Sequence, residues 1–400
     1  MPTCGVGTES SEKVAVAPED HGPPFFVYNF PALARSRSTI VTLPILSDLL
    51  EKIAACFTVK GRNTDNDTAR DTVRPLENPS ILSCARSHLY YIVEDSSERR
   101  RSVEARYRHK LPDAHFIDST DCAKLLSDKN VQAVLVCTPT FTHKEIVCKA
   151  LAAGKHVFCE KPIAQSNESV RECYEQAKLH GVNLFCAFNR RYDPGLRKIK
   201  NSLMNGELGD VFLVKTTSRD SPIPSLDYLR TSGGIFHDCA VHDIDVVCWL
   251  LGEKPVRVQV FGSLLSPALQ ELHDKDFDTV VICFHFASGK LAIIDLSRNA
   301  CYGYDQRCEV FGSKGMLQNA NHRPNGVFKW TPEASSQDPI LYSFASRYQE
   351  SYETELDYFL NLVSGRAEME ISQDHVLAVT RIASACEKSA KTGVVVELEW

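Results

Sequence analysis

The apolar and polar positions between residues 133 and 159 follow the order of a strand, a helix and a second strand. Residues 133–137 form a short apolar run rich in valine, as a strand covered on both faces does. In the helix that follows, Thr142 is a candidate N-cap and Gly154 is the expected end. Residues 155–159 return as a second buried strand. A unit this compact predicts a right-handed crossover between two strands of a parallel sheet.

Polar residues follow both of these strands. Thr138 and Pro139 come after the first strand, and Glu160, Lys161 and Pro162 come at the end of the second. Ligands of parallel sheets bind at the carboxyl ends of the strands. We therefore expect the two segments to face one crevice.

Strands and helices also alternate on both sides of this unit. A strand is predicted at residues 89–93, and the acidic residues Glu94 and Asp95 end it. The other elements predicted for this half of the chain are helices at residues 97–108, 120–127 and 167–180 and strands at residues 115–118 and 182–188. Regular alternation of this kind predicts a doubly wound, Rossmann-type domain.

From residue 210 the pattern changes to strands that follow one another directly. They are predicted at residues 211–217, 256–263, 279–286, 290–297 and 306–312, and helices are predicted at residues 236–251, 351–363 and 374–392. Alternating inward and outward residues indicate a mostly antiparallel sheet with one exposed face. The chain is thus predicted to be an α/β protein, with a Rossmann-type doubly wound parallel sheet domain followed by an α+β domain with a mostly antiparallel open sheet.

The limits of the domains follow from these elements. Residues 1–45 are mostly polar and lack periodicity, so we expect a loosely ordered N-terminal extension. An amphipathic helix is predicted at residues 42–55. Residues 46–165 are expected to form the Rossmann-like domain, with a degenerate first unit, and residues 166–400 the α+β domain.

The composition excludes several classes of protein. With 400 residues, of which 43% are hydrophobic and 24% charged, the chain can bury the cores of two domains. A net charge of −6 argues against nucleic acid or an anionic membrane as a partner, and no apolar run is long and uncharged enough to cross a membrane. The 15 cysteines are scattered without a CxxC pair, which indicates buried thiols in a reducing, cytoplasmic compartment rather than disulfides or a zinc site.

In combination, the motifs resemble those of the Gfo/Idh/MocA oxidoreductases, the relatives of glucose–fructose oxidoreductase and inositol dehydrogenase. The resemblance runs from about Leu89 to the C-terminus. It rests on the strand that ends in Thr138-Pro139, the strand that ends in Glu160-Lys161-Pro162, and the later Gly233-Gly234, Asp238 and His242-Asp243.

This resemblance implies an NAD(P)-dependent dehydrogenase that acts on CH–OH groups. The substrate would be a cyclitol, polyol or sugar, as for inositol 2-dehydrogenase, and the second domain would hold it. Members of this family tend to associate through the open face of the second sheet, which implies a homo-oligomer. The alternative is a non-catalytic binding or regulatory protein on the same fold, with weakened cofactor binding.

Three residues are candidates for the chemistry. Lys161 stands at a strand end, where a lysine withdrawn from water can exchange protons near neutrality; otherwise it is a surface lysine or is paired with Glu160. Asp238 and His242 are four residues apart on one predicted helix, so they share a face. They are either an oriented proton-transfer pair or a hydrogen-bonded pair on the helix surface. The resemblance assigns Lys161, Asp238 and His242 to catalysis, and Asp238 and His242 also to the substrate.

The expected cofactor is NAD. Glu94 ends a strand where an acid accepts hydrogen bonds from the adenosine ribose and repels a 2′-phosphate, and Asp95 lies beside it. Arg99, Arg100 and Arg101 on the following helix leave NADP open as an alternative.

Two further groups are assigned by the resemblance. Thr138, Pro139 and His143 resemble the family's nicotinamide-side loop, next to Glu160 and Lys161; the alternative for His143 is a capping residue in the first turn of its helix. Asn189 and Arg190 are expected either to line the substrate pocket or to form salt bridges at the surface.

The glycine-rich turn of a dinucleotide fold is nearly absent. Such a fold needs G-x-G-x-x-G between its first strand and helix, so that backbone amides reach the pyrophosphate. Upstream of Glu94, residues 59–64 contain only Gly61. Either residues 56–64 are a degenerate first strand and loop, with Gly61 at the cofactor, or the family's first unit has been replaced.

Overall fold

The structure is a computed structural model that describes residues 55–59, 87–273 and 275–400. The expected N-terminal extension, residues 1–45, lies outside the described residues, and so does Gly61. The helix expected at residues 42–55 also lies outside them, except for Ala55, which begins a strand.

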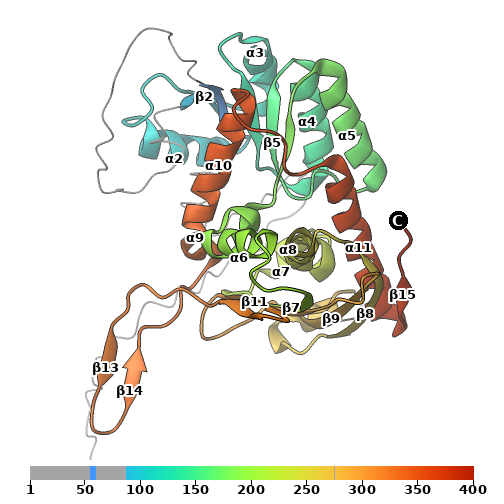
Figure 1. Cartoon of the computed structure of the whole chain (residues 1–400). Helices are drawn as coiled ribbons and strands as arrows, with labels where there is room; N and C mark the ends of the chain where they lie inside the picture. The colour runs from blue at the N-terminus through green and yellow to red at the C-terminus, as the bar shows by residue number, and fades with distance from the viewer. Residues whose placement is uncertain (1–54, 60–86, 274) are drawn as a thin grey trace, which may run out of the picture. The chain divides into compact units, whose positions relative to one another are not determined.

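The first domain, which contains the strands labelled β2 and β5 in Figure 1, is built on a six-stranded sheet with the strand order β3-β2-β1-β4-β5-β6. The strands are β1 Ala55–Val59, β2 Ser87–Val93, β3 His115–Ile117, β4 Ala133–Val136, β5 His156–Glu160 and β6 Leu184–Ala187. Strand β2 pairs parallel with β3, and β4, β5 and β6 pair parallel in turn. The predicted doubly wound, Rossmann-type sheet is confirmed.

Strand β1 differs from the other strands in its direction. It pairs antiparallel with β2 on one side and with β4 on the other. Its last residue, Val59, pairs with Ser87, the first residue of β2, so β1 ends at the amino edge of the parallel strands. The sequence allows residues 56–64 to be a degenerate first strand and loop or the family's first unit to have been replaced, and the first strand of a Rossmann fold would end at the opposite edge, where ligands bind.

Helices connect the parallel strands of this sheet. They are α2 Ser97–Tyr107, α3 Cys122–Ser127, α4 Thr140–Ala152 and α5 Asn167–His180. The expectation that Thr142 caps α4 is wrong, because the helix begins at Thr140, directly after Pro139. Thr142 lies in its first turn and donates its hydroxyl to the carbonyl oxygen of Pro139 at 2.8 Å.

The second domain is built on a seven-stranded sheet with the order β12-β11-β7-β10-β9-β8-β15. Its strands are β7 Val211–Arg219, β8 Pro255–Ser263, β9 Thr279–Phe286, β10 Leu291–Ser297, β11 Asp305–Gly312, β12 Gly315–Asn319 and β15 Val396–Glu397. All neighbours pair antiparallel except β7 and β10, which pair parallel. The predicted mostly antiparallel sheet is confirmed.

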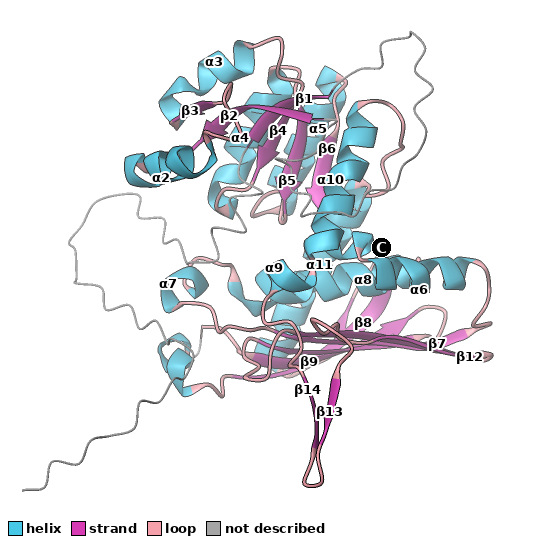
Figure 2. Ribbon diagram, turned by 90° about the vertical axis from the view of Figure 1, so that its left-hand side faces the viewer, coloured by secondary structure: helices cyan, strands magenta, loops and turns pink. Residues whose placement is uncertain are grey.

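Helices cover one face of this second sheet, and a hairpin stands out from the other (Figure 2). The helices are α6 Pro194–Met204, α8 Val241–Leu251 and α11 Gln373–Thr392, and the hairpin consists of β13 Phe328–Trp330 and β14 Ser335–Gln337. Helix α10, Gln349–Val363, runs beside η3, Asn189–Tyr192.

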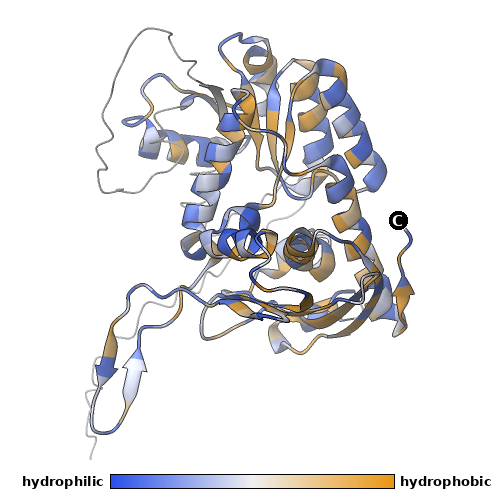
Figure 3. Cartoon of the chain, viewed as in Figure 1, coloured by the Kyte–Doolittle hydropathy of each residue, from blue (hydrophilic) through white to orange (hydrophobic). Residues whose placement is uncertain are grey.

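Apolar residues are concentrated on the strands of both sheets and on the helices that pack against them (Figure 3). One continuous hydrophobic cluster contains buried residues of both sheets, such as Phe158 of β5 and Ile282 of β9. Because β6 belongs to the first sheet, we propose that the domain boundary follows Ala187 rather than residue 165. Among the helices that the structure describes, none has the length and apolar character that crossing a membrane requires.

Candidate active site

Lys161 stands at the carboxyl end of β5, as expected, and its side chain reaches the second domain. The Nζ atom donates to the main-chain oxygen of Asp238 at 2.6 Å and lies 3.4 Å from the carboxylate oxygen Oδ1 of the same residue. The Lys161 side chain is 14% exposed and that of Asp238 is 10% exposed. Lys161 is therefore not a solvated surface lysine, and its charge faces Asp238.

The carboxylate of Asp238 is surrounded by donors. The hydroxyl of Tyr228 donates to Oδ1 at 2.7 Å, and Arg298 donates from Nη1 to Oδ2 at 3.1 Å. Burial by itself raises the pKa of Asp238, but the charges of Lys161 and Arg298 and the hydrogen bond from Tyr228 hold it below its ordinary value. Asp238 is therefore ionised at neutral pH.

A second acid shares Arg298 with Asp238. Arg298 is fully buried, and its Nη2 lies 3.4 Å from Oδ2 of Asp276. The other carboxylate oxygen of Asp276 accepts from the backbone N–H of Ile235 at 2.9 Å. Gly234 adopts φ +84°, and a Cβ there would lie 3.2 Å from Asp276, so the position favours glycine.

The expected helix at residues 236–251 begins with a π-helical turn. This turn, η4, covers Phe236–Ala240 and contains Asp238, and α8 continues from Val241. Such turns are rare and occur frequently at functional sites. His242 follows in the first turn of α8 with a half-buried side chain, and its role in proton transfer stays a prediction.

The acids at the end of β2 make local contacts. Oε1 of Glu94 accepts from the backbone N–H of Ser96 and from Nη2 of Arg99, both at 2.8 Å. Asp95 accepts from the backbone N–H of Ser119 at 2.7 Å, which ties the end of β2 to the turn after β3. Arg99, which could receive a 2′-phosphate, is thus paired with Glu94.

His143 joins the two loops that the sequence placed in one crevice. It is 1% exposed, with Nε2 at 2.7 Å from the carbonyl oxygen of Thr138 and Nδ1 at 2.8 Å from that of Pro162. Thr138 and Pro139 follow β4, and Pro162 follows β5. The expectation that these loops lie together is confirmed, and His143 is a buried link between them rather than a helix cap.

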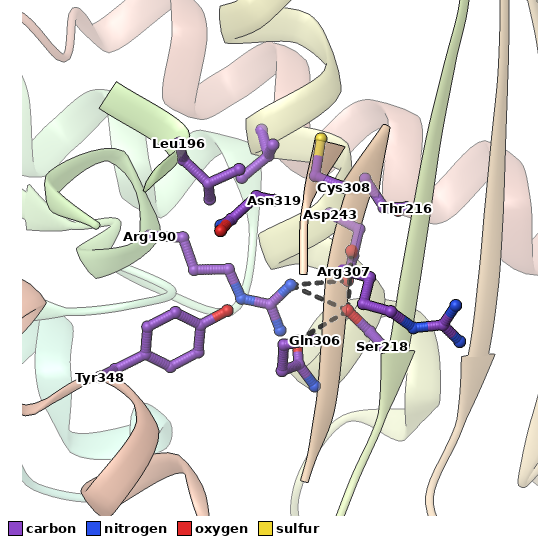
Figure 4. Close-up of a pocket in the computed structure, with 11 residues that line it drawn as sticks. Arg190, Leu196, Thr216, Ser218, Asp243, Gln306, Arg307, Cys308, Asn319 and Tyr348 are labelled. Carbon is purple, nitrogen blue, oxygen red and sulfur yellow. Dashed lines mark hydrogen bonds and ion pairs between the residues drawn. The ribbon is translucent and has the colours of Figure 1, made fainter. Parts of the chain in front are cut away.

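Asn189 and Arg190 are buried, so the alternative of surface salt bridges is wrong. The main-chain oxygen of Asn189 accepts from the Ser351 hydroxyl. Nη1 of Arg190 lies 3.0 Å from Oδ2 of Asp243 and donates to the Ser218 hydroxyl at 2.9 Å (Figure 4). Their expected contact with substrate stays a prediction.

A small cavity lies beside this ion pair, between η3, α8 and the strands β7 and β11. Its volume is about 10 Å³, which is room for a single water molecule. The lining includes Arg190, Ser218, Asp243, Gln306 and Tyr348 (Figure 4). This cavity is too small for a cyclitol. We therefore place the candidate active site at the contact between Lys161 and Asp238, at the carboxyl end of β5.

Comparison with known proteins identifies relatives over most of the chain. A family model described as the oxidoreductase family with an NAD-binding Rossmann fold matches residues 70–188, and the GFO/IDH/MocA C-terminal domain matches residues 196–318. The first match begins after β1. The myo-inositol 2-dehydrogenase of Thermotoga maritima is 41% identical over 281 residues, which are 70% of this chain and 83% of the relative.

Solved structures agree with these relatives. A myo-inositol dehydrogenase from Corynebacterium glutamicum is 30% identical, has a TM-score of 0.72, and the alignment covers 80% of this chain and 94% of that one. A scyllo-inositol dehydrogenase from Lactobacillus casei, solved with bound NAD(H) and scyllo-inositol, is 25% identical, has a TM-score of 0.69, and the alignment covers 77% and 91% of the two chains.

Proposed function

This chain belongs to the Gfo/Idh/MocA oxidoreductase family, and we propose that it is an NAD-dependent dehydrogenase that oxidises a secondary alcohol of a cyclitol such as an inositol. The observation that carries the proposal is the contact of Lys161 with Asp238 at the carboxyl end of β5. In a doubly wound fold this is the edge where ligands bind. The inositol dehydrogenases among its relatives support the choice of substrate.

The chain's own residues handle the proton of the substrate hydroxyl. His242 accepts that proton, either directly or through Lys161, whose ammonium group gives up one of its own protons as it takes up the proton of the hydroxyl. Asp238 is ionised and orients the Lys161 ammonium group. Bound NAD would supply the acceptor for the hydride that leaves the carbon bearing the hydroxyl.

The cofactor side of the crevice fits a dinucleotide in part. Glu94 offers a carboxylate at the end of β2 for the adenosine ribose, and the Thr138-Pro139 and Glu160-Lys161 segments lie at the ends of β4 and β5 for the nicotinamide side. Because Arg99 is paired with Glu94, NAD is favoured over NADP. We assign no residue to the binding of the pyrophosphate, because β1 ends at the edge of the sheet opposite to the one where ligands bind.

The test is a spectrophotometric assay of NADH formation by the purified protein. We expect turnover with myo-inositol or scyllo-inositol and at least about tenfold lower kcat/KM with an acyclic polyol of the same carbon number. NADH binding without turnover on any polyol or sugar would favour the non-catalytic alternative instead.

We also propose that the protein is a homo-oligomer that pairs through the open face of the second sheet. Cross-strand partners lie on one face, and the register places exposed apolar residues of this face in two rows. Phe261 pairs with Val281 in one row, and Leu291 is linked through Leu213 to Phe311 and Met316 in the other. The hairpin on the same side exposes Phe328 and Trp330. An apolar face of this kind marks an interaction surface.

Light scattering of the eluting protein tests the oligomer. We expect Phe261→Glu together with Phe311→Glu to lower the mass towards that of the monomer. Leu179→Glu, an exposed position on α5, is the control and should leave the mass unchanged. A monomeric wild-type protein would contradict the proposal.

We propose a cytosolic location because the described cysteines are free thiols, many of them buried. Many of them lie in the apolar core, such as Cys159, Cys186 and Cys386, and no disulfide is present within the described residues. Burial raises the pKa of these three thiols well above the ordinary value, which makes them inert. This pattern is typical of a reducing compartment.

A further inference from the structure

Both oxygen atoms of the Asp238 carboxylate face donors from distant parts of the chain. Tyr228 donates to Oδ1 at 2.7 Å and Arg298 donates to Oδ2 at 3.1 Å, while Lys161 approaches Oδ1 at 3.4 Å. A carboxylate held on both oxygens cannot rotate without losing a charge-assisted hydrogen bond. Its orientation relative to Lys161 is therefore fixed.

Arg298 is in turn held on its far side. It is 0% exposed and directs Nη2 to Asp276, whose second oxygen accepts from the backbone N–H groups of Ile235 and Phe277, both at 2.9 Å. Arg298 thus links the carboxylate of Asp238 to the backbone just before the π turn. The N–H donors of a buried arginine lie in the fixed plane of its guanidinium group, and an ammonium group offers no such plane.

Tyr228 reaches the same carboxylate from outside the main core. It lies in α7, Leu226–Leu229, whose Leu229 packs with Leu269 and Leu272 in a small separate cluster. The Tyr228 side chain is 45% exposed, so its ring gains little from burial. Its hydrogen bond to Asp238 is therefore the specific contact that fixes the side chain.

We propose that Tyr228 and Arg298 are positioning residues that hold Asp238 ionised and correctly oriented beside Lys161. The proposal rests on the proposed function, because it gives Asp238 a part in that reaction. Held in this way, Asp238 does not take the substrate proton itself. It acts by orienting the ammonium group of Lys161.

The ionisation of Asp238 depends on groups from several elements that pack around it. Asp220, which follows β7, accepts from the Cys239 thiol at 3.3 Å, and its burial together with the nearby charge of Asp238 raises its pKa. The charged and titratable groups that face Asp238 are Lys161 after β5, Asp220, Tyr228 of α7, Cys239 of η4 and Arg298 after β10. Asp276 joins them through Arg298.

The test compares the wild-type protein with Tyr228→Phe, which keeps the ring and removes the donor. Selective isotope labelling of aspartate carboxyl carbons reports the titration of Asp238 by NMR, and Asp238→Asn identifies its signal. We expect Tyr228→Phe to raise the pKa of Asp238 by about one pH unit, a tenfold change in its ionisation constant. We expect kcat with myo-inositol to fall about tenfold, which corresponds to about 1.4 kcal/mol.

Two further variants make the result specific. Tyr342→Phe removes a hydroxyl from a tyrosine that is 62% exposed, and we expect it to change neither the titration nor kcat. Arg298→Lys keeps the positive charge but replaces the planar guanidinium group by an ammonium group. We therefore expect kcat to fall while the affinity for NADH stays within about twofold.

An unchanged Asp238 titration in Tyr228→Phe would overturn the proposal. A lowered melting temperature with no change in the titration would do the same, since it would indicate a structural role only. The NMR titration needs no turnover. A wild-type protein inactive on every inositol would therefore refute the proposed function while Tyr228 and Arg298 remained testable.

Discussion

Lys161 donates to the main-chain oxygen of Asp238 at 2.6 Å, and this contact joins two residues that are 77 positions apart. It connects the carboxyl end of β5 in the first sheet to the π turn that precedes α8 in the second domain. Because the acceptor is a main-chain oxygen, the contact does not depend on the ionisation of the Asp238 carboxyl group. The lysine is therefore held at the junction of the two domains whether or not that carboxyl group is ionised.

Replacing Lys161 by alanine should lower turnover while the fold and cofactor binding persist. We expect kcat with an inositol to fall at least about a hundredfold, the usual range for a lost acid/base group. The affinity for NADH should change little. Steady-state kinetics and a fluorescence titration with NADH measure the two effects.

Lys149→Ala is the control for that experiment. Lys149 is an exposed lysine on α4 that pairs with Glu145, and its loss should leave kcat unchanged. Equal turnover in wild-type protein and Lys161→Ala would remove Lys161 from the proposed chemistry.

The stability that Asp238 contributes should disappear in acid. Its folded pKa lies below the unfolded value of about 3.9, so the ionised form stabilises the fold above that pH, and the contribution is lost as pH falls through the folded pKa. We expect Asp238→Asn to lower the free energy of unfolding by about 3 kcal/mol at pH 7, because Arg298 is left with one partner fewer. Urea titrations of both proteins should converge as the pH falls below about 4.

Glu94 provides a test of cofactor choice. Glu94→Ser removes the carboxylate that repels a 2′-phosphate and releases Arg99 from its ion pair, so the NAD/NADP preference should narrow or invert. Ratios of kcat/KM with the two cofactors measure the preference. The control is Glu98→Ser, in the first turn of α2, which should leave this ratio unchanged. A Glu94→Ser protein with the wild-type ratio would mean that other residues select the cofactor.

The sequence predicts those parts of the site that depend on local pattern. Periodicity and turn residues place Lys161, Thr138 and Glu94 at strand ends, and parallel strands bring such ends to one edge. It does not predict that Tyr228 and Arg298 meet at Asp238. Those contacts join segments that only tertiary packing brings together, and no motif distinguishes Arg298 from other arginines.

Local signals also mislead where neighbouring structure overrides them. Thr142 has the side chain of a cap, but Pro139 fixes the start of α4 earlier and Thr142 bonds back to it. One alternative for residues 56–64 is a degenerate first strand and loop, yet nothing in this segment sets the direction of the strand. In the structure this strand, β1, is antiparallel to both neighbours.

The direction of β1 bears on the last prediction, the strength of cofactor binding. A dinucleotide fold offers backbone N–H groups to the pyrophosphate from a glycine-rich turn that follows its first strand at the ligand edge. Here β1 ends at Val59 beside Ser87, at the other edge, and the family match begins only at residue 70. We therefore expect the protein to bind NADH with a dissociation constant above about 100 μM, weaker than about −5.5 kcal/mol.

A chimera in which residues 55–64 are replaced by a strand and turn carrying G-x-G-x-x-G should bind at least about tenfold tighter, a gain of about 1.4 kcal/mol. Paired calorimetric titrations measure both constants, with a chimera whose three glycines are replaced by alanine as the control. Low-micromolar binding by the unaltered chain would mean that other residues supply the pyrophosphate contacts.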